Sequence, residues 1–198
     1  MPRSLYMTRD FTKAAAYHNK QMRAVAQSVQ LLFSAPGFYK GEWGRKDGNN
    51  CYNFALHIST HDFLQPGFLS DLAAYGPPAT PEYLHEGALA DGLIYMGKSF
   101  LKCPGDHFPV ALFLEDEASD DYHWFALRQK VENNEPTGRY IWCHKNGDRP
   151  PEVIRDQDTI FSVAQKEQYP VFAGYYAVPY ELTYYRAGRR YTSNSIYA

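Results

Sequence analysis

The sequence contains no uninterrupted apolar run that approaches the roughly 20 residues needed to cross a bilayer. Its first residues, MPRSLYMTRDF, also lack the apolar stretch of a cleavable signal peptide. We therefore expect a protein that is cytoplasmic, or that is exported without a cleavable signal peptide. A membrane is not an expected partner.

Cysteine and net charge are both scarce. The chain has three cysteines, Cys51, Cys103 and Cys143, and an odd number at wide spacing is not a disulfide framework. We expect reduced thiols. The formal net charge is −2, so no overall field attracts the protein to nucleic acid, and no nucleic-acid partner is expected.

The chain has enough apolar residues for an ordinary folded domain. Its 198 residues are 44% hydrophobic and 21% charged, which is a globular composition. We expect a single domain over 1–198, with an N-terminal helix within 1–36, a core over 37–180 and a tail over 185–198. The 17 tyrosines suit a cleft or an interface as well as a core.

Helical patterns precede strand patterns along the chain. Apolar periodicity predicts a helix over 10–33, a second helix from Cys51 with Asn49 or Asn50 as its cap, and a third from Thr80 to about Met96. Short runs rich in aromatic and β-branched residues predict strands at 108–114, 122–129, 138–145 and 171–178. Helices followed by strands favour an α+β fold with a mainly antiparallel sheet.

Cys51 is the cysteine best placed for reactivity. It follows a loop rich in glycine and asparagine and opens an apolar helix. The positive end of a helix dipole favours thiolate over thiol, so the position predicts a lowered pKa. The alternative is a small buried core residue, because free cysteine is often buried.

Two histidines fall on one face of a predicted hairpin. The polar stretch KVENNEPTG separates the strands 122–129 and 138–145, and a turn centred at Asn133–Asn134 sets the register. The predicted cross-strand pairs are Gln129–Gly138, Leu127–Tyr140, Phe125–Trp142 and His123–His144. We expect the helix that starts at Cys51 to pack against this histidine-bearing face.

A cysteine at a helix start facing a strand histidine is the arrangement of thiol hydrolases. The imidazole of His123 would take the thiol proton and return it to the leaving amine, and His144 would hold that imidazole in its working tautomer. Asn146 or Asp148 could replace His144 in the orienting role. A histidine that is simply hydrogen-bonded in the core is the competing interpretation.

This pattern resembles the papain-like superfamily, and NlpC-type cell-wall peptidases in particular. Those enzymes carry a cysteine at a helix start and then a histidine and a further polar residue on successive strands, which here fall on Cys51, His123 and His144. The family's loop tyrosine matches Tyr39 in FYKGEWGRKDGNNC. The resemblance covers 37–145 and implies a papain-like, NlpC-like fold in which N-terminal helices pack on an antiparallel sheet.

The resemblance also sets expectations for the rest of the site. We expect Tyr39 and Asn50 to contact substrate or its oxyanion, together with the backbone N–H of Cys51. The sequence around the nucleophile, Asn50-Cys51-Tyr52-Asn53, departs from the family's Asp-Cys-Ser-Gly. Neither a metal nor another cofactor is expected. A zinc set of Cys103, His107, Cys143 and His144 is disfavoured because neighbouring strand residues point to opposite faces.

The expected activity is cleavage of a peptide or amide bond by one catalytic domain. A peptide or protein is the expected substrate, with a peptidoglycan peptide as one candidate, and the protein could be a bacterial toxin or effector met by an inhibitor or immunity protein. The same site could support deamidation or acyl transfer. The alternative from another class is an aromatic-rich binding module without catalysis, favoured by aromatics beside the histidines such as Tyr122, Trp124 and Trp142.

Overall fold

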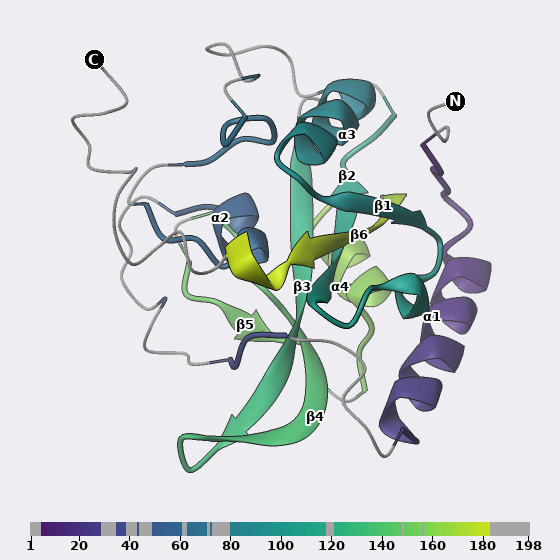
Figure 1. The fold of residues 1–198 in the computed structure, drawn as a ribbon. Helices are drawn as coiled ribbons and strands as arrows, with labels where there is room; N and C mark the ends of the chain where they lie inside the picture. Colours follow the sequence, from purple (N-terminus) through teal and green to yellow (C-terminus); the bar gives the residue numbers. More distant parts are fainter. Residues whose placement is uncertain are drawn as a thin grey trace.

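The computed structural model has an α+β architecture built on a six-stranded antiparallel sheet of order β1-β6-β2-β3-β4-β5 (Figure 1). The structure describes residues 5–28, 35–38, 43, 49–60, 63–70, 72, 80–117, 121–147, 149–155 and 157–182. The predicted tail over 185–198 lies outside these residues. The helices and the antiparallel sheet confirm the α+β class predicted from the sequence.

Three helices come first along the chain, and mostly strands follow them. The helices are α1 (Phe11–Ala26), α2 (Cys51–Leu56), α3 (Pro81–Ala90) and α4 (Ile160–Lys166), with a 3₁₀ turn at Phe100–Lys102. The strands are β1 (Ile94–Gly97), β2 (His107–Leu114), β3 (Tyr122–Glu132), β4 (Glu135–His144), β5 (Glu152–Val153) and β6 (Val171–Pro179).

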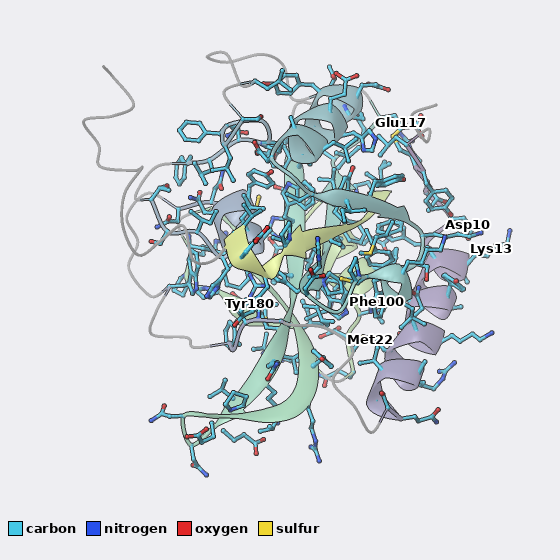
Figure 2. All side chains as sticks on the ribbon, viewed as in Figure 1. Asp10, Lys13, Met22, Phe100, Glu117 and Tyr180 are labelled. Atoms are coloured by element: carbon cyan, nitrogen blue, oxygen red, sulfur yellow. The ribbon has the colours of Figure 1, made fainter. Side chains whose placement is uncertain are left out.

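The helix starts agree with the sequence better than the helix ends do. Asp10 caps α1 by accepting from the backbone N–H of Lys13, and its carboxylate also pairs with the Lys13 ammonium; Figure 2 shows both residues at the start of that helix. The first helix ends at Ala26, short of the predicted 33. The third ends at Ala90, not near Met96, because Gly92 takes a positive φ of 92° and the chain then turns into β1. The sequence reading missed β1, α4 and β5.

The sheet separates two apolar layers. On one face α2 packs with Tyr122, Trp124 and Ala126 of β3. On the other face α1 and α4 pack with Phe125 and Leu127 of the same strand. Figure 1 shows α1 and α2 on opposite sides of the sheet. The even-numbered and odd-numbered positions of β3 thus serve different layers, as the period of two requires.

The predicted hairpin is present, but its register changes part-way. The turn lies at Asn133–Asn134 as predicted, and Val131 pairs with Pro136. Beyond it, residues 137–139 of β4 lie opposite Lys130 alone, and Gly138 in this bulge has a φ of 73°. The bulge adds two residues to β4.

The direct pairs named from the sequence are therefore wrong by two positions. Phe125 pairs with His144, Leu127 with Trp142 and Gln129 with Tyr140. A slip of two keeps every side chain on its face, whereas a slip of one would reverse it. His123 and His144 consequently still share a face, as predicted, although they are diagonal neighbours.

His18 is a buried titratable group in the α1 layer. Its side chain is 3% exposed, its Nδ1 lies 2.8 Å from the Tyr175 hydroxyl, and the rings of Phe100, Trp142 and Phe161 surround it. Burial lowers the pKa of His18 to about 3. The neutral imidazole is thus part of the core.

In the described part of the chain, no helix combines the length and apolarity that spanning a bilayer demands.

The burial of His18 predicts a pH-dependent stability. An unfolded histidine binds a proton below about pH 6.5, while folded His18 stays neutral to about pH 3. The unfolded state therefore binds more protons in this window, and His18 alone should remove roughly 3 kcal/mol of stability as pH falls from 6.5 to 4. In His18→Gln, which does not titrate, this part of the loss should be absent. Urea unfolding of both proteins between pH 7 and pH 4 measures it, and parallel curves would contradict it.

Candidate active site

The N-terminus of α2 is held by a reciprocal cap. Asn50 Oδ1 accepts from the backbone N–H groups of Tyr52 and Asn53, each at 3.0 Å. Asn53 Oδ1 accepts in turn from the N–H of Asn50 at 3.0 Å. Asn50 also donates to the carbonyl of Leu64 at 2.7 Å. The predicted cap is confirmed, and it leaves the N–H of Cys51 as the first-turn donor that the cap does not use.

The C-terminus of α2 is held by a buried cation. Arg128 of β3 is 1% exposed, and its guanidinium donates to the carbonyls of Phe54 and Ala55 at the end of the helix. The same guanidinium lies over the rings of Phe54 and Phe108, with its Cζ 5.2 and 4.8 Å from their centroids. A cation suits the negative end of a helix dipole. All six residues of α2 are buried.

Cys51 meets the sheet at the beginning of β3. Its side chain is buried, and Sγ donates to the Tyr122 carbonyl at 3.9 Å. Since α2 packs on the Tyr122, Trp124 and Ala126 face, the expectation that this helix covers the histidine-bearing face is wrong. The apolar residues Tyr52, Phe54 and Leu56 direct the helix there, because they complete the core beneath Trp124.

Cys51 and His123 nevertheless line one cavity. It has a volume of about 350 Å³ and lies at the start of β3, since Asp121, Tyr122 and His123 line it. Cys51 approaches from one face and His123 from the other. The residues lining the cavity are Asn50, Cys51, Gln65, Asp121, Tyr122, His123, Asn146, Gly147 and Tyr169.

His144 holds the imidazole of His123. The Nε2 of His123 and the Nδ1 of His144 lie 2.9 Å apart, with the two rings nearly perpendicular at 84°. Because Nε2 is engaged in this bond, a proton exchanged with Cys51 has to use Nδ1 of His123. Of the orienting groups considered from the sequence, Asn146 instead donates to Glu167. Asp148 and Tyr39 lie outside the described residues.

Burial keeps both the thiol and the imidazole neutral. The pKa of Cys51 is raised to about 12, first by burial, although backbone N–H groups of Trp124, Tyr52 and Cys51 itself oppose the rise. The pKa of His123 lies well below its usual value because of burial and the neighbouring His144. The lowered Cys51 pKa expected from the helix dipole is therefore wrong for the free protein, since desolvation of the charge outweighs the dipole.

A buried lysine ties the strand that carries His144 to the segment before Cys51. Lys145 is 1% exposed, and its ammonium donates to the carbonyl of Asn49 at 2.6 Å and to that of Gly147. These bonds connect the end of β4 with the start of α2. No sequence pattern predicts this role, because a lysine after a strand is ordinarily exposed.

A buried carboxylate fixes the segment that supplies Gln65. Asp91 accepts from the Tyr52 hydroxyl and the Gly67 N–H, each at 2.8 Å, and from the N–H and hydroxyl of Ser70. Gln65 itself accepts from the Tyr122 hydroxyl. Sequence reasoning missed Asp91, Gln65, Asp121 and Tyr169, which lie far apart in the chain.

The residues considered as metal ligands do not gather. Within the described ranges, no group of three or more His, Cys, Asp or Glu side chains has the arrangement of a metal site. This covers the four side chains of the disfavoured zinc set, which are Cys103, His107, Cys143 and His144.

Comparison with known proteins gives one partial similarity. No family model matches the chain, and no solved structure matches it. A stretch of 99 residues is 32% identical to "Insoluble matrix shell protein 1" of Ruditapes philippinarum. The match covers 50% of this chain and 56% of that protein, so the chain spans about half the length of the relative it matches.

The electrostatics predict a ranked thiol reactivity. Cys51 should alkylate with iodoacetamide before Cys103 and Cys143, because it lines the cavity and burial raises the pKa of both other thiols further. Its rate should keep rising above the pKa of a free thiol, about 8.5. Mass mapping of labelled peptides between pH 6 and pH 10 measures this. A plateau below pH 8.5 would instead restore the thiolate expected from the helix dipole.

The lysine tie predicts a large loss of stability on removal. Lys145→Met keeps much of the side-chain volume but leaves the carbonyls of Asn49 and Gly147 without this donor, so unfolding should become about 2–4 kcal/mol easier. Lys130→Met is the matched control. Its ammonium pairs with Glu132 near the surface, and its loss should cost about 0.5 kcal/mol or less. Equal urea midpoints for the two variants would refute the tie.

Proposed function

We propose that this protein is a cysteine-nucleophile hydrolase of peptide or amide bonds, with Cys51 as nucleophile, His123 as base and His144 as the orienting group. The observation that carries the proposal is the cavity shared by Cys51 and His123, in which Nε2 of His123 is already bonded to His144. A papain-like, NlpC-like fold belongs to the same proposal. The cysteine at a helix start and the polar residue on the next strand support it.

The proposed reaction begins with transfer of the Cys51 proton to Nδ1 of His123. The thiolate sulfur attacks the substrate carbonyl and forms a tetrahedral intermediate, whose oxyanion the N–H of Cys51 can bind. The intermediate collapses as the C–N bond breaks, and the His123 imidazolium gives its proton to the leaving amine. Water, deprotonated by His123, then attacks the thioester and releases the acid and the free thiol.

Because Cys51 and His123 are both neutral in the free protein, we expect the proton transfer between them to follow substrate binding. Thiolate and imidazolium are both disfavoured in the buried free site. A substrate carbonyl beside Cys51 allows the negative charge to move from sulfur to the oxyanion, where a backbone donor meets it. Proton transfer and attack on the carbonyl are thereby coupled. The thiol would stay largely unreactive until a substrate fills the cavity.

Acyl transfer by the same site is a second candidate, and the partial similarity favours it. The name of the matched protein describes an insoluble matrix. The thioester formed at Cys51 would join two protein chains if a lysine amine replaced water, and an amide nitrogen lost from glutamine would give deamidation. Mass spectrometry of products separates the three outcomes by the mass of the acyl product. That the protein acts as a bacterial toxin or effector is a separate proposal about its biological role.

A non-catalytic binding module is the candidate from another class. The observation that favours it is the neutral, buried state of both Cys51 and His123, which a binding pocket tolerates without further chemistry. The polar lining of Gln65, Asn146 and Tyr169 would then contact a ligand directly. Turnover decides between this candidate and the hydrolase.

The test is the hydrolysis of peptide and amide substrates by four variants. Cys51→Ala and His123→Ala should each lower turnover by roughly 10²–10⁴-fold or more. The double variant should be little worse than either, because residues of one catalytic unit are non-additive. His144→Ala should lose less, since it orients the base without carrying the transferred proton.

The matched control is Cys103→Ala, which removes a buried thiol outside the cavity and should keep activity. Circular dichroism confirms folding of each variant. Full turnover by folded Cys51→Ala would end the hydrolase proposal. Normal turnover by His144→Ala alone would leave the pair of Cys51 and His123 intact and move the orienting role elsewhere.

A further inference from the structure

The imidazole of His123 is covered by Tyr169. The two rings are stacked, with centroids 5.1 Å apart and planes 19° from parallel. Phe125 meets the imidazole edge-on at 4.8 Å and 84°, and His144 holds Nε2. The stacked Tyr169 ring therefore fixes the plane of the imidazole, and with it the direction in which Nδ1 points. It also lines the cavity with Cys51.

Tyr169 is held in place from both of its ends. Helix α4 stops at Lys166, Gln168 takes a left-handed φ of 71°, and the N–H of Tyr169 then donates to the Ala164 carbonyl at 2.8 Å. At the other end the phenol donates to Asp121 Oδ2 at 3.1 Å. Asp121 accepts through Oδ1 from the N–H of Tyr122, where β3 begins. The ring thus connects α4 to the strand that carries His123.

This placement matters most when His123 is protonated. Burial and His144 both lower the pKa of His123, so an imidazolium formed there needs a compensating interaction. The face of an aromatic ring attracts a cation, and the attraction grows in a desolvated site. A stacked tyrosine supplies that face and also restricts rotation of the imidazole.

We propose that Tyr169 is a positioning residue for His123 through its stacked ring, and that Asp121 acts by holding Tyr169. The inference rests on the proposed function, because it assigns Tyr169 to the step in which His123 carries the Cys51 proton. It explains why a polar aromatic at the end of a helix lies against a buried histidine. The Phe125 and His144 contacts alone leave that face of the imidazole without a partner.

The experiment compares ring loss with hydroxyl loss. Tyr169→Leu should lower kcat about 3- to 30-fold with little change in KM, because it removes the stacked face. The acid limb of its kcat–pH profile should move to lower pH, since a less stable imidazolium lowers the pKa of His123. Tyr169→Phe keeps the ring but loses the bond to Asp121, so its kcat should fall between those of wild type and Tyr169→Leu. Asp121→Asn should match Tyr169→Phe, and the double variant should be no worse than either.

Other titratable groups near the two rings stay unchanged in the comparison of Tyr169→Leu with Tyr169→Phe. They are Asp121, Cys51 and Glu167 around Tyr169, and Glu152 and Glu167 around His144. The matched control is Phe161→Leu, an aromatic truncation in the core on α4 itself. It should lower the melting temperature and leave the kcat profile in place.

A second readout needs no substrate. The titration of the His123 imidazole followed by NMR should move to lower pH in Tyr169→Leu, because the imidazolium loses its stacked ring, and should stay in place in Tyr169→Phe. If wild type turns over no substrate while this shift is present, the proposed hydrolase fails and the positioning role stands. If Tyr169→Leu behaves like Phe161→Leu, with lower stability and unchanged profiles, the positioning role is overturned. Equal damage from the Phe and Leu variants would also overturn it.

Discussion

The anchoring of the six-residue helix α2 is the constraint on which the site depends. A helix of this length is not stable alone, because its nucleation cost exceeds what so few hydrogen bonds return. Here Asn50 satisfies the first turn, Arg128 satisfies the last carbonyls, and the Tyr52 hydroxyl reaches Asp91. Each of these buried polar groups has a partner, as a low-dielectric interior requires. The position of Cys51 follows from them.

The site combines two layers that the sheet otherwise keeps apart. Cys51 belongs to the layer beneath α2, and His123 belongs to the layer beneath α1 and α4. They line one cavity at the start of β3, where Asp121, Tyr122 and His123 contribute to its wall. Lys145 ties the end of β4 to the segment before α2 at the same place. A small displacement of α2 relative to β3 would change the distance between the Cys51 thiol and the His123 imidazole.

Burial decides the resting state of this site. The helix N-terminus does stabilise a thiolate at Cys51, but the cost of desolvating the charge is larger and the thiol stays protonated. Burial acts in the same direction on His123. Groups that stabilise the transient imidazolium therefore gain importance, and His144 and Tyr169 are the ones that contact His123 through a ring nitrogen and a ring face. In the proposed hydrolase, Cys51 would become reactive only as substrate enters.

Local sequence signals determined the α+β class, the capped helix start at Cys51, the turn at Asn133–Asn134 and the shared face of His123 and His144. Each of these depends on neighbours within a few residues or on the period of a strand, which a bulge of two residues does not change. The tertiary structure alone decided the face that α2 covers, the bulge at Gly138 and the meeting of Asp121, Tyr169 and Lys145 around the cavity. It also reversed the expected Cys51 pKa, because desolvation depends on what surrounds a thiol in space and not on the residues that precede it in the chain.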